Sequence, residues 1–419
     1  MLKYLKIKNF LSFSEETTFS MEANLSKDRS MTDNIFTVNG EKLLKTTAIY
    51  WPNSSWKTNL FRAFHCLKEL VVNSHNYSAG QSFPNLQPFL LKKNSSLEPI
   101  EFEVSFLMDG YDFLYQVKLF LDHVYFESLY RVQWNKKIKL FERKEQKIKL
   151  HNAFDDKGMS SNVKENSLAV SVYSTRNAEI PKKIVNFFNN MYIFIGGTSD
   201  LDTFNMLNKD GKFKHFLSWM LSDSGIKKVE HVTEEKLVGE LDPELKKTLL
   251  DKLPPSVVLS PEHKIKLNQA WFVHNVLDEQ GNVVWEVVFG KNQESMWTGR
   301  LFDLLWSIYD VVYQGKILLI DELDSSLHTE LVKKLIHVLH KKSLHFQIIF
   351  NTHDTNLLDI DELFRKDQIW FAEKDPVKGT SKLVRLSDKK IRKDMVVEKN
   401  YLKWKLGALP IDTEKTDIL

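Results

Sequence analysis

The sequence is poor in cysteine and in glycine. Cys66 is the only cysteine among 419 residues, which excludes a disulfide framework and a zinc site built from cysteines. The chain has 15 glycines, well below the share of roughly 7% that is usual in proteins. Tryptophan, with 10 residues, is by contrast abundant.

Long apolar runs and a strong net charge are also missing. No uncharged apolar stretch approaches the roughly 18 residues that a membrane-spanning helix requires. The start, "MLKYLKIKNFLSF", alternates like a strand and is interrupted by lysines, so it does not resemble a signal peptide. The net charge of +3 is too small to indicate nucleic acid or a membrane as a partner. We therefore expect no membrane association and a cytoplasmic location.

The first half of the chain contains patterns of both strands and helices. "TTAIY" (46–50) predicts a strand, and residues 57–74 have apolar side chains at helical spacing. Residues 99–150 indicate successive antiparallel strands, in which the basic stretch 136–150 favours an exposed hairpin over a nucleic-acid site. From about 176 to 256 the apolar spacing is helical.

The last part of the chain alternates strand and helix. Strand-like runs near 269–289 precede a helix from about 298. "KILLIDE" (316–322) and "FQIIFNTHD" (346–354) predict buried strands on either side of an amphipathic helix over 328–342, and this order predicts a parallel α/β sheet. The expected division is an amino-terminal lobe over 1–175, a helical insert over 176–260 and a carboxyl-terminal lobe over 261–419.

The stretch "YWPNSSWKTNL" (50–60) lies between an expected strand and an expected helix and is close to a phosphate-binding loop. Such loops follow G-x-x-x-x-G-K-[ST], in which glycines let backbone amides approach the phosphates. Lys57 and Thr58 stand in place, but both glycine positions hold tryptophan, Trp51 and Trp56. An indole at 56 would fill the space beside Lys57, so the chain as written is expected to bind a nucleotide poorly.

Three further stretches carry candidate chemistry. Asp321 and Glu322 end the first buried strand, where an aspartate can hold Mg²⁺ and the next carboxylate can polarise an attacking water; an acidic turn is the alternative. His353 ends the second strand and can bond a phosphate, although a lone histidine is more often structural. Ser295 stands before a helix, where an anion site can form; an ordinary helix cap is the alternative.

The order of these elements resembles the ABC-type ATPases, in the SMC-like branch that includes RecF and OLD-type proteins. The chain is most similar to bacterial AAA-type ATPases of abortive-infection and phage-defence systems. The shared motifs are "KNFLSF" (8–13), "ESMWT" (294–298), "DELDSSLH" (321–328), "FNTHDTNLLD" (350–359), "DQIWFAEKD" (367–375) and "EKNYLKWKLGALP" (398–410). The resemblance implies a P-loop NTPase fold of ABC/SMC type, with a mostly parallel central sheet flanked by helices, an antiparallel β-subdomain and an inserted helical subdomain.

The resemblance also implies roles in the phosphate loop. Lys57 would contact the β- and γ-phosphates of ATP. Thr58 would bind Mg²⁺, with Asp321 supporting the metal. Asn53 and Asn59 would belong to the loop.

Three residues would complete hydrolysis in such an enzyme. Glu322 would be the catalytic carboxylate and His353 the switch histidine. Ser295 would reach the γ-phosphate of an ATP held by a second subunit. The resemblance therefore implies a head-to-tail ATP sandwich and at least a homodimer.

Tryptophan replaces the glycine of this family at four positions: Trp51, Trp56, Trp297 and Trp404. A decaying site should show mixed substitutions and loss of Lys57 or Glu322, yet both are present. Some bacterial lineages read the UGA codon as glycine, whereas other codes read it as tryptophan. We hypothesise that these four residues are misread glycines. The same hypothesis leaves open four further tryptophans: Trp134, Trp219, Trp271 and Trp285.

Together these features predict an ATP-binding and ATP-hydrolysing switch that controls a separate effector in phage defence. The residues after His353 match the family's own tail, so we expect no appended nuclease. A DNA-repair ATPase of the RecF kind is the alternative, and it would need a basic groove for nucleic acid. If the motif tryptophans are real, a nucleotide-dead interaction protein is the third reading.

Overall fold

The chain is described by a computed structural model. It covers residues 1–389 apart from 26–30, 52–57, 134–135, 152–153, 155–162, 177, 197–202, 204–205, 208–209, 223–224, 244–245, 248, 250–258, 326 and 359–361. Two compact units are present. The main unit comprises Met1–Gly197 and Asp310–Leu419, and the inserted unit comprises Thr198–Tyr309.

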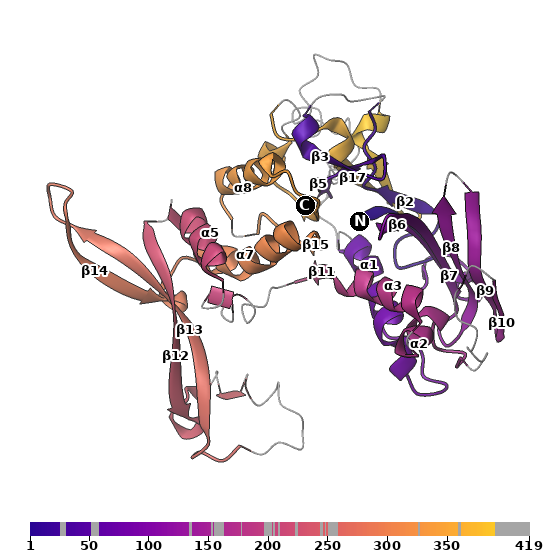
Figure 1. Ribbon diagram of the computed structural model, residues 1–419, viewed down its shortest axis with the longest axis horizontal. Helices are drawn as coiled ribbons and strands as arrows, with labels where there is room; N and C mark the ends of the chain where they lie inside the picture. Colours follow the sequence, from indigo (N-terminus) through magenta and orange to yellow (C-terminus); the bar gives the residue numbers. More distant parts are fainter. Residues whose placement is uncertain are drawn as a thin grey trace, which may run out of the picture. The chain divides into compact units, whose positions relative to one another are not determined.

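A six-stranded sheet in the order β11-β15-β16-β5-β17-β18 forms one layer of the main unit (Figure 1). Every pair among the first five strands is parallel, and only β18 runs antiparallel to its neighbour. The apolar runs predicted as strands lie at its centre and are fully buried, as parallel strands covered on both faces require. The strands are β11 Met191–Phe194, β15 Ile317–Ile320, β16 Gln347–Thr352, β5 Thr46–Tyr50, β17 Ile369–Lys374 and β18 Ser381–Arg385.

A second, antiparallel sheet of seven strands belongs to the same unit, in the order β10-β9-β8-β7-β6-β1-β2. The predicted basic hairpin is its outer pair, β9 and β10. The strands are β1 Leu2–Lys8, β2 Thr17–Ser20, β6 Ile100–Met108, β7 Tyr111–Leu119, β8 Val124–Gln133, β9 Lys136–Lys144 and β10 Lys147–Leu150; β3 Ile35–Val38 and β4 Glu41–Leu44 form a separate two-stranded ribbon.

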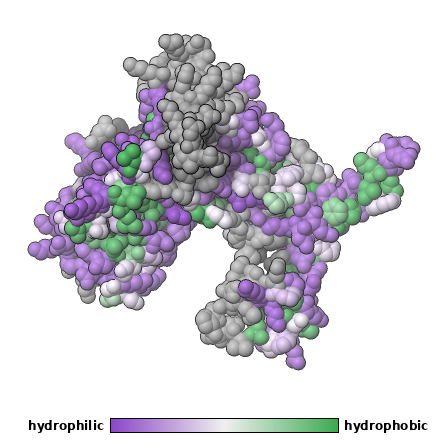
Figure 2. Space-filling model, turned by 180° about the vertical axis from the view of Figure 1, so that it is seen from behind, coloured by the Kyte–Doolittle hydropathy of each residue, from purple (hydrophilic) through white to green (hydrophobic). Residues whose placement is uncertain are grey.

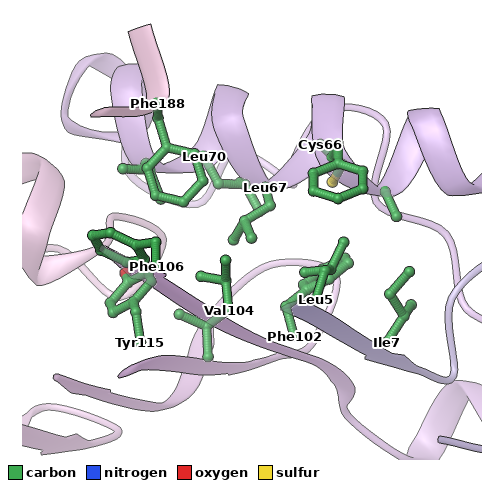
Figure 3. Packing of buried hydrophobic residues seen from close by; sticks show 14 of the residues in the cluster. Leu5, Ile7, Cys66, Leu67, Leu70, Phe102, Val104, Phe106, Tyr115 and Phe188 are labelled. Carbon is green, nitrogen blue, oxygen red and sulfur yellow. The ribbon is translucent and has the colours of Figure 1, made fainter. Parts of the chain in front are cut away.

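Helix α1 (Asn59–Asn73) packs against the antiparallel sheet. Its apolar face, including Cys66, Leu67 and Leu70, meets side chains of β1, β6 and β7, as Figure 3 shows. The same core continues to Ile49 and Leu319 of the parallel sheet. Because α1 shares a core with both sheets, the start of α1 is held near the end of β5. A phosphate-binding loop lies between such a strand and helix.

Three further α-helices lie wholly within the main unit: α2 Ala169–Thr175, α3 Glu179–Asn189 and α8 Thr329–Lys341. Helix α8 is the predicted amphipathic helix between β15 and β16. Lys45 Nζ donates to the carbonyls of His340 at 2.8 Å and Lys342 at 2.7 Å, which satisfies the last carbonyls of α8. Among the described helices, none has the length and apolarity that crossing a membrane requires.

The inserted unit is built on a three-stranded antiparallel sheet, β12-β13-β14. Aromatic side chains pack its helices together and against the sheet. The ring centroids of Phe213 and Trp306 are 5.0 Å apart, and those of Phe272 and Phe302 are 5.5 Å apart. The boundary between the two units falls within α7. The elements are α5 Gly211–Leu221, β12 Ile226–Leu237, β13 Lys264–Leu277, β14 Val283–Gly290 and α7 Met296–Gln314.

Two parts of the predicted helical insert (176–260) are strands instead. Residues 191–194 form β11, which pairs with β15, and residues 226–237 form β12, which pairs with β13. In both segments the hydrogen-bonding partners lie outside the segment itself, so inter-strand pairing overrides the local helical spacing. The contacts also group 198–309 as one unit, so the expected boundaries at 176 and 260 do not coincide with it.

Candidate functional site

The carboxyl ends of the parallel strands bring a hydroxyl and a carboxylate together. Thr58 directly precedes α1 and follows β5, whereas Asp321 directly follows β15. The Thr58 hydroxyl donates to Asp321 Oδ2 at 3.0 Å, although the two residues are 263 positions apart. Open α/β sheets bind their ligands at this edge, so the contact joins two predicted metal-site residues where a ligand is expected.

Asn351, near the end of β16, links the two acidic residues of the site. Its side-chain amide donates to Asp321 Oδ1 at 2.5 Å, and its side-chain oxygen accepts the backbone N–H of Glu322. Its own carbonyl accepts the N–H of Leu323 at 3.2 Å. Asn351 is only 2% exposed. No sequence pattern singled out Asn351; its one signal is a polar side chain directly after the apolar run 348–350 of a strand that is buried throughout.

Glu322 has an unusual backbone conformation. Its φ is +56°, in the left-handed region that costs a residue with a Cβ roughly 1–2 kcal/mol. The bond from its N–H to Asn351, and a 3.0 Å bond from Ser325 N to its carbonyl, hold this turn. Backbone strain of this kind, held by surrounding bonds, is concentrated at functional sites.

His353 lies at the tip of the neighbouring strand and is half-buried. Its backbone N–H donates to Asp324 Oδ2 at 3.2 Å, and the Thr329 hydroxyl donates to Asp354. The first bond joins the "DELD" turn after β15 to the end of β16, and the second joins the start of α8 to the residue that follows His353. The carboxylate pair and the histidine predicted from sequence therefore belong to one bonded edge.

The donor set of this edge suits Mg²⁺. Magnesium in nucleotide sites is held by one or two carboxylates or hydroxyls together with substrate phosphates, rather than by a cage of protein ligands. Thr58 and Asp321 offer such hard oxygen atoms. Within the described ranges, no cluster of three or more histidine, cysteine, aspartate or glutamate side chains forms a metal cage.

The centre of the phosphate loop falls in the gap 52–57, so the predicted residues Asn53, Trp56 and Lys57 lie outside the described residues, as does Trp404. The loop is bounded by Trp51 and Thr58.

Trp51 and Asn59 flank the loop and are both buried. Asn59 Nδ2 donates to the Ser12 hydroxyl at 3.0 Å, which fastens α1 to the "KNFLSF" segment. Trp51 is 4% exposed, and its indole N–H has no hydrogen-bond acceptor among the residues that the structure describes. Such a buried, unpaired donor costs about 1–3 kcal/mol. Trp370, in the stretch "DQIWFAEKD", shares this feature, so an indole N–H without a described acceptor does not by itself identify a misread codon.

Ser295 belongs to the inserted unit and caps α7. Its hydroxyl oxygen accepts the Thr298 N–H at 3.3 Å and lies 2.8 Å from the Thr298 hydroxyl. This is the helix-cap geometry that the sequence left as an alternative, and Ser295 is exposed. Glu294 is held by His274 Nε2 at 2.6 Å, and Trp297 lies in the first turn, partly buried.

Of the four tryptophans left open, three are described. Trp219 lies on α5 and is 39% exposed, and Trp285 lies on β14 and is 62% exposed. Trp271 lies on β13 and donates to Gln269 Oε1 at 3.4 Å. Trp134 lies outside the described residues.

Two solved structures are similar to this chain over most of its length. One is an SMC head domain from Thermotoga maritima, 15% identical, covering 92% of this chain and 98% of that one, with a TM-score of 0.40. The other is an SMC head bound to the C-winged helix domain of ScpA, 14% identical, covering 91% and 97%, with a TM-score of 0.45. A search of curated proteins found no match.

A protein family matches residues 47–359, which is most of the chain and includes both the phosphate-loop segment and the edge with Asp321 and His353. Its description is "AAA domain, putative AbiEii toxin, Type IV TA system". The mixed α/β fold with a mostly parallel central sheet agrees with the predicted fold class. The chain belongs to this family of AAA-domain proteins.

Proposed function

We propose that this protein is an ATP-binding and ATP-hydrolysing switch that controls a separate effector in phage defence. The observation that carries the proposal is the bonded edge formed by Thr58, Asp321, Asn351 and Glu322 at the carboxyl ends of three parallel strands. Lys57, next to Thr58, would contact the β- and γ-phosphates. Bound Mg²⁺ would neutralise phosphate charge, and Thr58 and Asp321 would hold it.

Glu322 is the proposed catalytic carboxylate. It orients a water toward the γ-phosphorus and accepts a proton from that water. As the water oxygen bonds to the γ-phosphorus, the bond from this phosphorus to the bridging oxygen breaks, giving ADP and phosphate. His353 would sense the γ-phosphate as the switch histidine. Because the Glu322 backbone is bonded to Asn351, the positions of catalytic and metal-supporting carboxylates are coupled.

A homodimer would complete each nucleotide site. Ser295 and the backbone amides at the start of α7 would form an anion site, which we propose contacts the γ-phosphate held by the second subunit. ADP lacks that phosphate and would not support closure of the dimer. This difference in contacts would make ATP the signal that the effector reads.

Mixed dimers test this arrangement in the protein carrying glycine at 51, 56, 297 and 404. With Ser295→Arg in one subunit and Lys57→Ala in the other, both defects fall on one composite site, so about half of the ATPase activity is expected to remain. With both substitutions in the same subunit, each site carries one defect and activity should vanish. The reverse pattern would show that each site is completed within one subunit.

Asn351 should position the catalytic carboxylate. Asn351→Leu keeps the shape but removes both side-chain bonds, so kcat for ATP hydrolysis is expected to fall by about 100-fold while KM changes little. In Asn351→Asp the carboxylate can still accept the Glu322 N–H, so kcat should fall less. The exposed Asn76→Leu is the matched control. Equal losses in kcat and ATP affinity would indicate a purely structural role.

The effector and the defence role rest on the family that the chain matches. An effector gene adjacent to this one is the expected finding in the genomic DNA, and deletion of either gene should remove protection in a plaque assay. A switch that consumes ATP must work where ATP is abundant, so we place it in the cytoplasm. Protection that survives Glu322→Gln would separate the defence role from hydrolysis.

A further inference from the structure

Strands β8, β9 and β10 form the outer margin of the antiparallel sheet (Figure 1). Residues paired across antiparallel strands share a side of the sheet, as do residues two apart on one strand. The register shift between Leu129 and Tyr130 skips one residue of β9, so the lysines before and after it lie on the same side. Five lysines share this side, which we call the lysine face: Lys137, Lys139, Lys144, Lys147 and Lys149.

The opposite side of the same strands belongs to the core. Phe141 and Arg143 are fully buried there, and the Arg143 guanidinium donates to the carbonyls of Ser167 at 2.5 Å and Lys164 at 3.0 Å. This burial fixes the orientation of the strands, so the lysine face points to solvent. Four of its five lysines are exposed and Lys139 is half-buried. Figure 2 shows mainly hydrophilic residues along this margin of the main unit.

The lysine face carries more positive charge than its neighbours neutralise. Glu142 is the one carboxylate that the register puts on the same side of the hairpin 136–150. Lys139 Nζ donates to Glu142 at 2.5 Å, and Lys144 Nζ lies 3.9 Å from it. Among the described residues, no carboxylate lies within ion-pair distance of the other three lysines. Glu145, in the turn, is the only other acidic residue of the hairpin, so the excess stays positive.

Farther along the same side of the sheet, on β1, β6 and β7, lysines are paired with acidic residues. Glu101 lies 3.2 Å from Lys8 and 2.6 Å from Lys118. Lys6 lies 3.4 Å from Glu103. The unbalanced positive charge is therefore concentrated at the margin formed by β9 and β10.

This arrangement has a cost for the isolated chain. Lys144 and Lys147 stand directly opposite each other on the two strands of the hairpin. Like charges in this position destabilise a strand pair, whereas an edge can be protected from aggregation by a few charges of either sign. Edge protection alone therefore does not account for five lysines on one side. A bound polyanion would remove the repulsion.

We propose that the lysine face binds the phosphate backbone of a nucleic acid. Lysines two apart on a strand are about 6.7 Å apart, and neighbouring strands are about 4.8 Å apart, so the face presents a flat array of cations. A nucleic acid supplies a matching row of closely spaced negative charges. Lysine is a flexible point charge and does not read base edges in this setting, so the binding is independent of sequence.

The side chains among the lysines favour a nucleic acid over a membrane surface. Membrane-surface segments combine basic residues with apolar side chains that enter the lipid boundary. The apolar side chains on the lysine face are Phe126, Tyr130 and Val132 of β8, and all three are partly buried. The Tyr130 ring is also covered by Lys139 Nζ, 5.6 Å from its centroid.

Binding of nucleic acid to the full chain in nucleotide-free buffer with EDTA tests the proposal. A short fluorescent DNA duplex of mixed sequence should bind, and its affinity should fall steeply with salt. Lys144→Gln with Lys147→Gln and Lys149→Gln should raise Kd at least about tenfold and reduce the salt slope by about two to three. Competition with single-stranded DNA and with RNA of the same length identifies the preferred backbone.

The matched control removes three exposed lysines elsewhere on the main unit: Lys93→Gln with Lys182→Gln and Lys378→Gln. Its net charge changes equally, and its Kd should stay within about twofold of the wild-type value. Equal losses in both triple variants, or no binding by the wild-type chain at low salt, overturn the proposal. Flotation with phosphatidylserine vesicles in the absence of duplex binding would assign the face to a membrane and also overturn it.

Lysine acetylation of the wild-type chain keeps the proposal falsifiable if the triple variant misfolds. Duplex DNA should protect Lys144, Lys147 and Lys149 from an acetylating reagent, while Lys93 and Lys182 stay reactive. Mass spectrometry of the peptides measures each site, and equal reactivity with and without DNA overturns the proposal. No residue of the lysine face belongs to the proposed nucleotide site, so ATP binding by the same variants reports on the proposed function alone.

Discussion

Glycine at positions 51, 56, 297 and 404 is expected to convert a chain that binds Mg-ATP weakly into one that binds it tightly. The largest part of the effect should come from position 56, because an indole beside Lys57 would occupy the space of the β-phosphate. Loss of those backbone contacts and of phosphate access should weaken binding by at least about 100-fold, or roughly 2.7 kcal/mol. Isothermal titration of both chains with ATP measures this directly.

The matched control is Trp370→Gly. Trp370 is 5% exposed and packs 5.4 Å from Phe19, so its removal should destabilise the fold by about 3–5 kcal/mol without improving ATP binding. Trp51→Gly also removes a buried ring, so the glycine-containing chain should gain affinity rather than stability.

The same hypothesis predicts the natural polypeptide. Peptide mass spectrometry of protein purified from its own host should find glycine at all four positions, and the gene should carry UGA there. Peptides with tryptophan at these sites would contradict the hypothesis and favour a nucleotide-dead interaction protein.

Glu322→Gln is expected to remove ATP hydrolysis while leaving ATP binding nearly unchanged. Glutamine preserves size and left-handed backbone strain but cannot take a proton from the attacking water, so turnover should fall by about 10²–10⁴-fold. Lys57→Ala should instead weaken binding itself, since it removes a positive charge from the phosphates. Phosphate release and equilibrium binding, measured on the glycine-containing protein, separate the two effects.

Glu330→Gln provides the control for this substitution. Glu330 lies in the first turn of α8 and is exposed, so the same chemical change there should leave turnover within about twofold. Unchanged turnover in Glu322→Gln would reject its catalytic assignment, and loss of ATP binding would indicate a role in assembling the metal site.

Local patterns determined the sheet and helices that surround the site. β5, β15 and β16 were predicted from apolar runs, and α1 and α8 from helical spacing, because side-chain periodicity depends only on neighbouring residues. The motif order also determined that Thr58 and Asp321 would belong to one site. The roles of Lys57 and Asn53 stay predictions, since both lie outside the described residues.

Tertiary structure alone decided the features that depend on distant partners. Residues 191–194 became β11 because Met191 pairs with Ile317, a partner far along the chain that local spacing does not show. Asn351 acquired its place between Asp321 and Glu322 only when β15 and β16 came into register. Strand pairing and side-chain bonds join residues that are distant in sequence, so a local pattern does not show their energy. The left-handed turn at Glu322, held by Asn351, is one result.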